Sequence, residues 1–218
     1  MEMPKSLEAK LAQGRQYRAV VQIEARAAGD GEPEAAMIVD GYAATFNQPY
    51  ELFRDDGYVF REQIAPDAFA ETDMSDVIMQ YDHEGRVFAR TGNGTLTLST
   101  DDHGLHIRAD LSGTEIGRQL YEEIRGGYTD KMSFGFTVDA DERVITEDKE
   151  ANTVDVLRTI TRIRKLYDVS AVSLPANNAT EISARSWCDG VIAQLEEERR
   201  QSAERERRVQ KIKILMEV

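Results

Sequence analysis

The stretch Lys131-Met132-Ser133-Phe134-Gly135-Phe136-Thr137-Val138 shows the clearest strand periodicity in the chain. Large apolar residues occupy every second position from 132 to 138, and small or polar residues alternate with them. Successive strand residues point to opposite faces of a sheet, so the apolar face of this strand enters a core. The other face carries Ser133 and Gly135. Because Gly135 has no side chain, we expect open space beside the Ser133 hydroxyl, wide enough for a peptide backbone.

Strand patterns continue on both sides of this segment. They cover residues 18–25, 36–46, 77–83, 94–100, 105–111 and 153–174, the last as two strands broken near Lys165. Gly41 predicts a bulge or a close approach of another backbone, and residues 139–152 are interpreted as a charged loop. Residues 114–125 have helical spacing, and residues 66–69 suit a helical turn. We therefore expect a mainly β chain with helices (α+β), a barrel or sandwich with helices outside.

The charge of the chain is unevenly distributed. The total is −13, but residues 185–218 carry eight basic and seven acidic side chains, a net of +1, which leaves −14 for residues 1–184. So acidic a body repels phosphates, which argues against nucleic-acid binding. We expect a disordered lead-in at 1–15, a folded domain at 16–184 and a charged helical tail at 185–218. The tail is an exposed helix, a partner-binding or removable segment, or both.

The composition also restricts where the chain works. It has no apolar stretch long enough for a membrane span and no signal-peptide core near residue 1, so we expect no membrane association. Its one cysteine, Cys188, excludes an internal disulfide framework and fits a reducing cytoplasm. Cys188 lies beside the charged tail, and the sequence favours an incidental over a catalytic role for it.

A catalytic serine needs a base, and the chain has three histidines. His103 falls in a hairpin connection and His106 on the outward face of a strand. His83 ends a strand just before the turn at Glu84, a frequent position for catalytic groups. Pattern alone nevertheless favours structural roles for both Ser133 and His83.

The remaining candidates are an acid and a metal site. Asp168 interrupts an apolar strand, where it either has a specific partner or faces outward at an edge. Asp101, His103 and His106 are close in sequence, but their side chains diverge through a tight hairpin. No His-Glu-x-x-His helix or cysteine pair is present, so we expect no metal and no cofactor.

Five stretches, taken in order, resemble the prohead protease family of tailed phages. They are GYAATFN at 41–47, EQIAPDAF at 62–69, YDH at 81–83, KMSFGF at 131–136 and YDVSAVSLPAN at 167–177. The family counterparts are its early strand, an "I-x-P-G-A-F" segment, the histidine motif, the nucleophile motif and an "E-V-S-x-V-x-x-P-A" segment. Two residues depart from this pattern: Asp67 stands where glycine is common and Asp168 where glutamate is usual.

The resemblance implies a fold similar to that of the herpesvirus assembly proteases, a barrel of about seven strands surrounded by helices, with residues 16–184 as the protease domain. It also implies a serine endopeptidase that cleaves scaffold and capsid-protein segments, and itself, during capsid assembly. Ser133 would be the nucleophile, His83 its base and Asp168 the third member. Backbone amides would bind the oxyanion, supported by Arg162, Arg164 and Gly135.

The resemblance further implies partners and a location. The expected partners are the major capsid protein with its scaffold segment, the portal and further copies of this chain. The expected location is the host cytoplasm, inside the assembling prohead, whether the gene is carried by a phage or an integrated prophage. Two other functions stay open: an inactive scaffold or capsid-assembly protein with the protease fold, and a metal-dependent hydrolase using His103 and His106.

Overall fold

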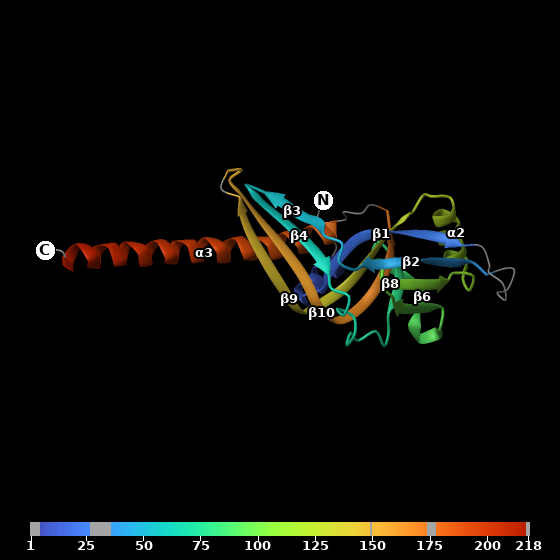
Figure 1. Ribbon diagram of the computed structural model, residues 1–218. Coiled ribbons are helices and arrows are strands. Elements are labelled where there is room, and N and C mark those ends of the chain that lie inside the picture. The colour runs from blue at the N-terminus through green and yellow to red at the C-terminus, as the bar shows by residue number, and fades with distance from the viewer. Residues whose placement is uncertain (1–4, 27–35, 149, 174–177, 217–218) are drawn as a thin grey trace.

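One long strand, β10 (Thr153–Val172), joins the parts of the sheet in the computed structural model (Figure 1). The structure describes residues 5–26, 36–148, 150–173 and 178–216. On one edge β10 pairs antiparallel with β9 (Lys131–Asp148). On its other edge it pairs parallel with β4 (Tyr58–Ile64) in its first half and with β5 (Ile78–Tyr81) near its end.

The other strands extend this centre into a ten-stranded sheet with the order β3-β4-β10-β9-β1-β2-β8-β7, and β5 and β6 pair off this path. Their bounds are β1 (Gln16–Arg26), β2 (Ile38–Thr45), β3 (Tyr50–Asp55), β6 (Glu84–Arg90), β7 (Leu96–Thr100) and β8 (Gly104–Asp110). The helices are α1 (Lys5–Ala12), the short 3-10 helix η1 (Thr91–Asn93), α2 (Glu115–Arg125) and α3 (Asn178–Met216).

The prediction of a mainly β chain with helices is confirmed. The sheet has more strands than the seven or so expected, and the described pairing runs as an open path from β3 to β7 and does not close into a barrel. The expected loop at 139–152 is wrong, because β9 continues to Asp148 and pairs with β10 from Thr153 onward. β10 is also unbroken at Lys165; register shifts between Ile160 and Asp168 absorb the irregularity. The bulge expected at Gly41 falls between Tyr42 and Ala44.

The apolar face of β9 enters the main core. Met132, Phe134 and Phe136 have no exposed surface, and the two phenylalanine rings stack with centroids 4.6 Å apart. Helix α2 covers this core with Leu120, Tyr121 and Ile124, and its first turn is capped by the Thr114 side chain, which accepts from Gly117 N.

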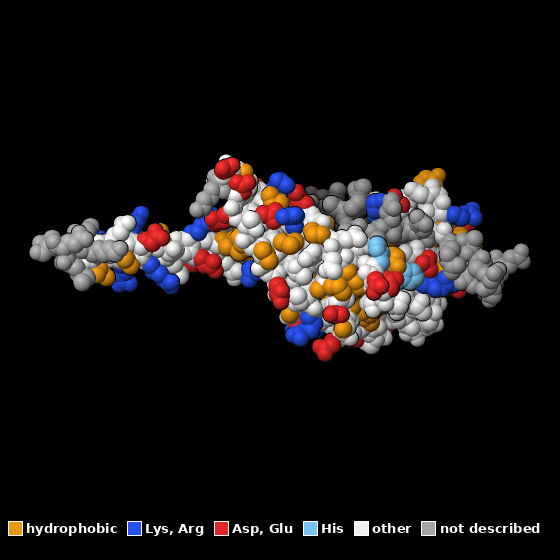
Figure 2. Space-filling view, in the orientation of Figure 1, with side chains coloured by type: hydrophobic (Ala, Val, Ile, Leu, Met, Phe, Trp, Pro, Cys, Tyr) orange, Lys and Arg blue, Asp and Glu red, His pale blue; other side chains and the backbone are white. Residues whose placement is uncertain are grey.

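Helix α3 has a packed beginning and a projecting end. Its first turns bury Cys188 and Val191 against Phe60, Val154 and Val156 in a second apolar cluster. Residues 198–212 are exposed and carry intermixed acidic and basic side chains (Figure 2). At 1.5 Å per residue, the helix is about 58 Å long and extends well beyond the sheet (Figure 1). No helix in the described part of the chain is both long and apolar enough to span a membrane.

The division into lead-in, domain and tail stays a prediction. Two observations bear on its boundaries: α1 lies inside the lead-in, and the first turns of the tail pack on the sheet.

Candidate active site

Ser133, His83 and Asp168 meet at one buried point of the fold. His83 Nε2 lies 2.6 Å from Ser133 Oγ, and His83 Nδ1 lies 2.5 Å from Asp168 Oδ1. Ser133 and His83 have no exposed surface, and Asp168 is 1% exposed. The imidazole therefore bridges a hydroxyl and a carboxylate, the arrangement in which a serine hydroxyl is activated by a histidine that an acid orients.

Adjacent strands bring the three side chains together. In the ladder between β9 and β10, Ser133 is opposite Ser170 and Gly135 is opposite Asp168. β5 runs along the other edge of β10, where Tyr81 is opposite Ala171 and Asp82 N donates to Ala171 O. His83 follows directly and turns back over β10 toward Ser133. Strand pairing thus brings residues that are far apart in the sequence close together, and the turn after β5 completes the site.

The turn that carries His83 has an unusual backbone. Asp82 and His83 both adopt positive φ, 47° and 62°, a conformation that non-glycine residues enter at a cost. The Asp82 carboxylate holds the turn by accepting from Ser173 N and Ser173 Oγ, each at 3.0 Å. The Lys10 ammonium donates to His83 O at 2.7 Å. This backbone lets His83 return toward the sheet instead of continuing β5.

Asp168 is charged in spite of its burial. Burial alone would raise the pKa of the carboxyl, but the charge and hydrogen bond of His83, a hydrogen bond from Ser170 and the charge of Arg15 lower the pKa overall. Ser170 Oγ lies 3.0 Å from Asp168 Oδ1. Two donors thus converge on Oδ1, which fixes the carboxylate and, through it, the imidazole.

The open space expected beside Gly135 is absent. A Cβ built on Gly135 would lie 2.4 Å from Asp168 Oδ2 and 2.9 Å from Tyr17 Cε1. The glycine makes room for the triad carboxylate and an aromatic ring, and a substrate backbone cannot occupy that space.

The N-terminal part of the chain adds three residues to the site: Lys10 on α1, Arg15 just before β1, and Tyr17 on β1. The Tyr17 ring is fully buried with its centroid 4.4 Å from that of His83. Burial and the nearby Asp168 charge raise the pKa of the Tyr17 hydroxyl above its ordinary value. Lys10 and Arg15 were missed because the sequence predicts a disordered lead-in up to residue 15, and Tyr17 because it precedes the strand predicted at 18–25. Ser170 had a signal: it stands two residues after Asp168 and so shares its strand face.

Arg162 and Arg164 do not join the triad. Arg162 is opposite Ala140, seven positions along β9 from Ser133, or about 23 Å at strand spacing. Both guanidinium groups are exposed and pair with the Asp139 carboxylate. The structure therefore offers no support for the expectation that they assist an oxyanion site.

The other candidates from the sequence also lie apart from the triad. His106 Nε2 contacts Asp40 Oδ1 at 2.7 Å, and the His103 ring packs edge-on against Tyr42. Among the described residues, no group of three or more His, Cys, Asp or Glu side chains converges as metal ligands would. Burial raises the pKa of the Cys188 thiol to about 12. That thiol is therefore not a nucleophile near neutral pH.

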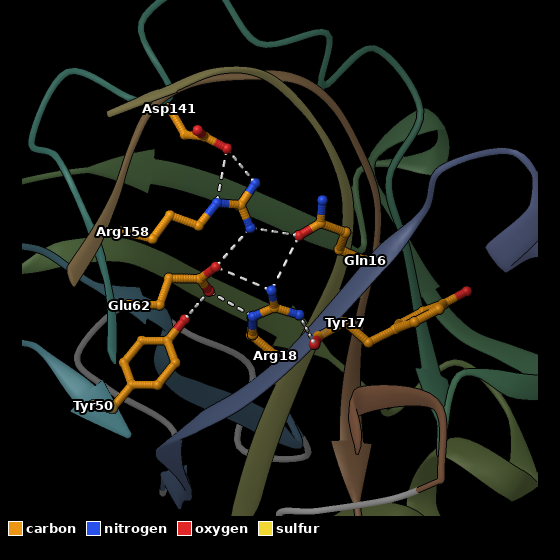
Figure 3. Close-up of polar contacts among 7 residues, drawn as sticks. All are labelled: Gln16, Tyr17, Arg18, Tyr50, Glu62, Asp141 and Arg158. Atoms are coloured by element: carbon orange, nitrogen blue, oxygen red, sulfur yellow. Dashed lines mark hydrogen bonds and ion pairs between the residues drawn. The ribbon is translucent and has the colours of Figure 1, made fainter. Parts of the chain in front are cut away.

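A network of buried charged side chains joins β1, β4 and β10 (Figure 3). The Glu62 carboxylate accepts from Arg18 Nε at 2.5 Å and from Arg158 Nη1 at 2.8 Å, and Tyr50 donates to the same carboxylate. Arg158 also pairs with Asp141 and lies over the Trp187 ring of α3. Arg18 Nη1 donates to Tyr17 O at 2.7 Å, which ties the network to the strand position of Tyr17.

Comparison with known proteins relates this chain to the proteases of tailed phages. The model of the family described as "Caudovirus prohead serine protease" matches residues 22–190. The prohead protease of Enterobacteria phage HK97 is 26% identical over 174 residues, which cover 78% of this chain and 68% of the relative. The solved structure of the bacteriophage T4 capsid assembly protease, gp21, aligns with 72% of this chain and 98% of that chain at 12% identity and a TM-score of 0.38. Because the family model covers most of its length, the chain belongs to the caudovirus prohead serine proteases.

Proposed function

We propose that this phage capsid maturation protease is a serine endopeptidase in which Ser133 is the nucleophile, His83 the general base and Asp168 the orienting acid. The observation that carries the proposal is the continuous line of contacts from Asp168 Oδ1 through His83 to Ser133 Oγ, at 2.5 and 2.6 Å. A serine hydroxyl is a weak nucleophile without such a base.

The chemistry follows from these contacts. His83 Nε2 removes the proton from Ser133 Oγ as the oxygen attacks the scissile carbonyl, and Asp168 stabilises the imidazolium that forms. His83 then gives the proton to the leaving amine, which produces an acyl-enzyme. A water deprotonated by His83 releases the second product and regenerates Ser133. Backbone N–H groups would stabilise the oxyanion in both steps.

The triad is closed to a peptide in the conformation described here. Because Ser133 and His83 have no exposed surface, a substrate segment reaches Ser133 Oγ only after neighbouring parts of the chain move. We propose that this opening accompanies capsid assembly, so that cleavage begins inside the prohead.

The substrates follow from the family. We propose that the enzyme cleaves the scaffold segment of the major capsid protein and also cleaves itself. We further propose that it contacts the portal, forms homo-oligomers and works in the host cytoplasm inside the assembling prohead. The charged half of α3 is exposed and suits a segment that directs packaging with the capsid protein.

Coexpression with the major capsid protein of the same phage tests the proposal. Proheads assembled with the wild-type chain should show cleaved capsid protein and cleaved protease, and Ser133→Ala or His83→Ala should leave both intact. Ser99→Ala, at an exposed serine of β7, is the matched control and should cleave normally. Intact products with the wild type would favour a non-enzymatic assembly role, and cleavage that survives Ser133→Ala but stops with a chelator would favour a metal-dependent hydrolase.

A further inference from the structure

Three buried polar atoms without hydrogen-bond partners gather behind the triad. They are Arg15 Nε, Tyr17 Oη and Asp168 Oδ2, and Thr137 Oγ1 is the only other such side-chain atom in the described part of the chain. Buried polar groups are rarely left unpaired, and a carboxylate oxygen is among the most costly to leave so. An opposite charge is therefore needed to compensate the buried Asp168 carboxylate.

Arg15 supplies the opposite charge. Its Nη1 lies 3.7 Å from Asp168 Oδ2, the oxygen that neither His83 nor Ser170 contacts. The Arg15 side chain is 15% exposed, so solvent screens this ion pair much less than a surface pair. His83 and Arg15 thus approach the two oxygens of one carboxylate.

The fold holds Arg15 from several directions. Gly14, with φ of 77°, lies in the turn that follows α1, and Arg15 N donates to Lys10 O at 3.3 Å in this turn. The guanidinium carbon lies 3.7 Å from the centroid of the Tyr167 ring. Two residues later, the carbonyl of Tyr17 is fixed by Arg18 of the buried network, whereas the Tyr17 ring points away from that network (Figure 3).

We infer that Arg15 is a positioning residue of the triad, which acts on Ser133 and His83 through the Asp168 carboxylate. The inference rests on the proposed function, since it assigns Arg15 a role only if Asp168 orients His83. It places part of the active site in the segment before β1, outside the five motifs of the sequence.

The positive charge of Arg15 has a predictable effect on pH dependence. The charge of Arg15 helps to lower the pKa of the Asp168 carboxyl, so this carboxylate stays ionised and keeps orienting His83 to lower pH than it would without Arg15. The other titratable groups around this pair are Lys10 from α1, Tyr17 from β1, Glu84 from β6 and Tyr167 from β10. The charge of Arg15 also acts on Tyr17, where it lowers the pKa of the hydroxyl, and Arg15→Lys retains that charge.

The test measures the rate at which a fluorophosphonate labels Ser133 as a function of pH, in proheads assembled with the capsid protein. Arg15→Gln should lower the plateau rate about tenfold and move the acid limb of the profile about one pH unit upward. Arg15→Lys keeps the charge and should restore the acid limb to the wild-type position. Arg54→Gln, which removes an exposed arginine paired with Glu51, is the matched control and should behave as wild type.

A purely structural role gives a different result. It would reduce the labelled fraction equally at every pH, and Arg15→Lys would not rescue the acid limb; that outcome, or an Arg15→Gln profile identical to wild type, overturns the inference. Thermal unfolding of each variant separates loss of folded protein from loss of rate. Failure of the proposed function is distinct, because wild-type Ser133 would then remain unlabelled or Ser133→Ala would still cleave.

Discussion

Gly135 lies between the Asp168 carboxylate and the Tyr17 ring, and it has no room for a larger side chain. Gly135→Ala should abolish most activity while the chain still folds. Its Cβ would stand 2.4 Å from Asp168 Oδ2 and cannot rotate away, so the carboxylate must leave its position against His83 Nδ1. We expect the rate to fall by about 10²- to 10⁴-fold, as for other losses of triad geometry.

Fluorophosphonate labelling in assembled proheads measures this loss. Gly113→Ala is the control, because a Cβ at Gly113 meets nothing within 4 Å. Equal labelling of Gly135→Ala and wild type would show that Asp168 need not occupy its present position.

We expect the negative charge of Asp168 to be essential for the rate of cleavage. Asp168→Asn keeps the shape but removes the charge, and its amide group can impose the wrong tautomer on His83. The rate should fall by roughly 10⁴-fold at neutral pH. Capsid-protein cleavage followed over time measures it. Ser170→Ala, which removes one of the two donors to Asp168 Oδ1, should cost much less, about tenfold. Near-wild-type cleavage by Asp168→Asn would assign the orienting role elsewhere.

We expect the buried network among β1, β4 and β10 to control the stability of the fold in acid. Burial would raise the pKa of the Glu62 carboxyl, but the charges of Arg18 and Arg158 lower it overall. Because the pKa of Glu62 is lower in the folded state than its ordinary value of 4.5, the ionised carboxylate stabilises the folded protein above pH 4.5. This stabilisation is lost as the pH falls from 4.5 through the folded-state pKa. Glu62→Gln should therefore destabilise the chain by about 3–5 kcal/mol at pH 7, because two buried arginines lose the negative charge of Glu62.

Denaturant unfolding between pH 7 and pH 3 measures both effects. The wild type should lose stability steeply below pH 4.5, and the slope should be shallower in Glu62→Gln. Arg61→Gln, which removes an exposed partner of Asp155, should change the free energy of unfolding by less than about 1 kcal/mol. Parallel pH slopes in Glu62→Gln and wild type would show that another carboxyl controls acid unfolding.

Helix α3 should behave as two different parts. A chain ending at residue 200 retains every contact of the second apolar cluster and should unfold at the wild-type temperature. Trp187→Ala removes a ring that packs edge-on against Phe60 and under Arg158, and should cost about 2–3 kcal/mol. Calorimetry compares the two. A large loss of stability in the shortened chain would show that the exposed turns also hold the fold.

The sequence predicted these elements unevenly, for physical reasons. The strand around Ser133 and the helix at 114–125 have strong periodicity and appear where expected. β3, β4 and β6 were not predicted, because charged residues interrupt their alternation and pairing with neighbours decides their conformation. The charged part of β9 was read as a loop for the same reason: its pairing with β10 depends on residues elsewhere in the chain.

The sequence identified the three triad residues but did not reveal their arrangement in space. Ser133 and His83 were identified from their motifs, and Asp168 from an acid in an apolar strand; the structure brings all three together. Register explains why Arg162 and Arg164 lie far away, and register is not visible in a single sequence. Tyr17 and Arg15 were missed because nothing in their local pattern suggests a contact with His83, 66 positions after Tyr17, or with Asp168, 153 positions after Arg15.

The closed triad predicts that the activity of the enzyme depends on capsid assembly. Fluorophosphonate labelling of Ser133 should be at least tenfold slower in the isolated chain than in proheads, because the hydroxyl has no exposed surface in the closed conformation. Labelling of both samples at one pH, normalised to the amount of folded protein, measures the difference. Equal rates would show that the chain opens freely in solution.

That closed state also matters to the infected cell. Ribosomes, chaperones and newly made phage proteins surround this enzyme from the moment it is synthesised. If Ser133 is the nucleophile and becomes accessible only on assembly, as proposed above, all of them are spared and the enzyme can accumulate without a separate inhibitor. The interval between its synthesis and its first cut is then a waiting time governed by a conformational transition, and mutations that loosen the closed state should harm the phage by acting too early.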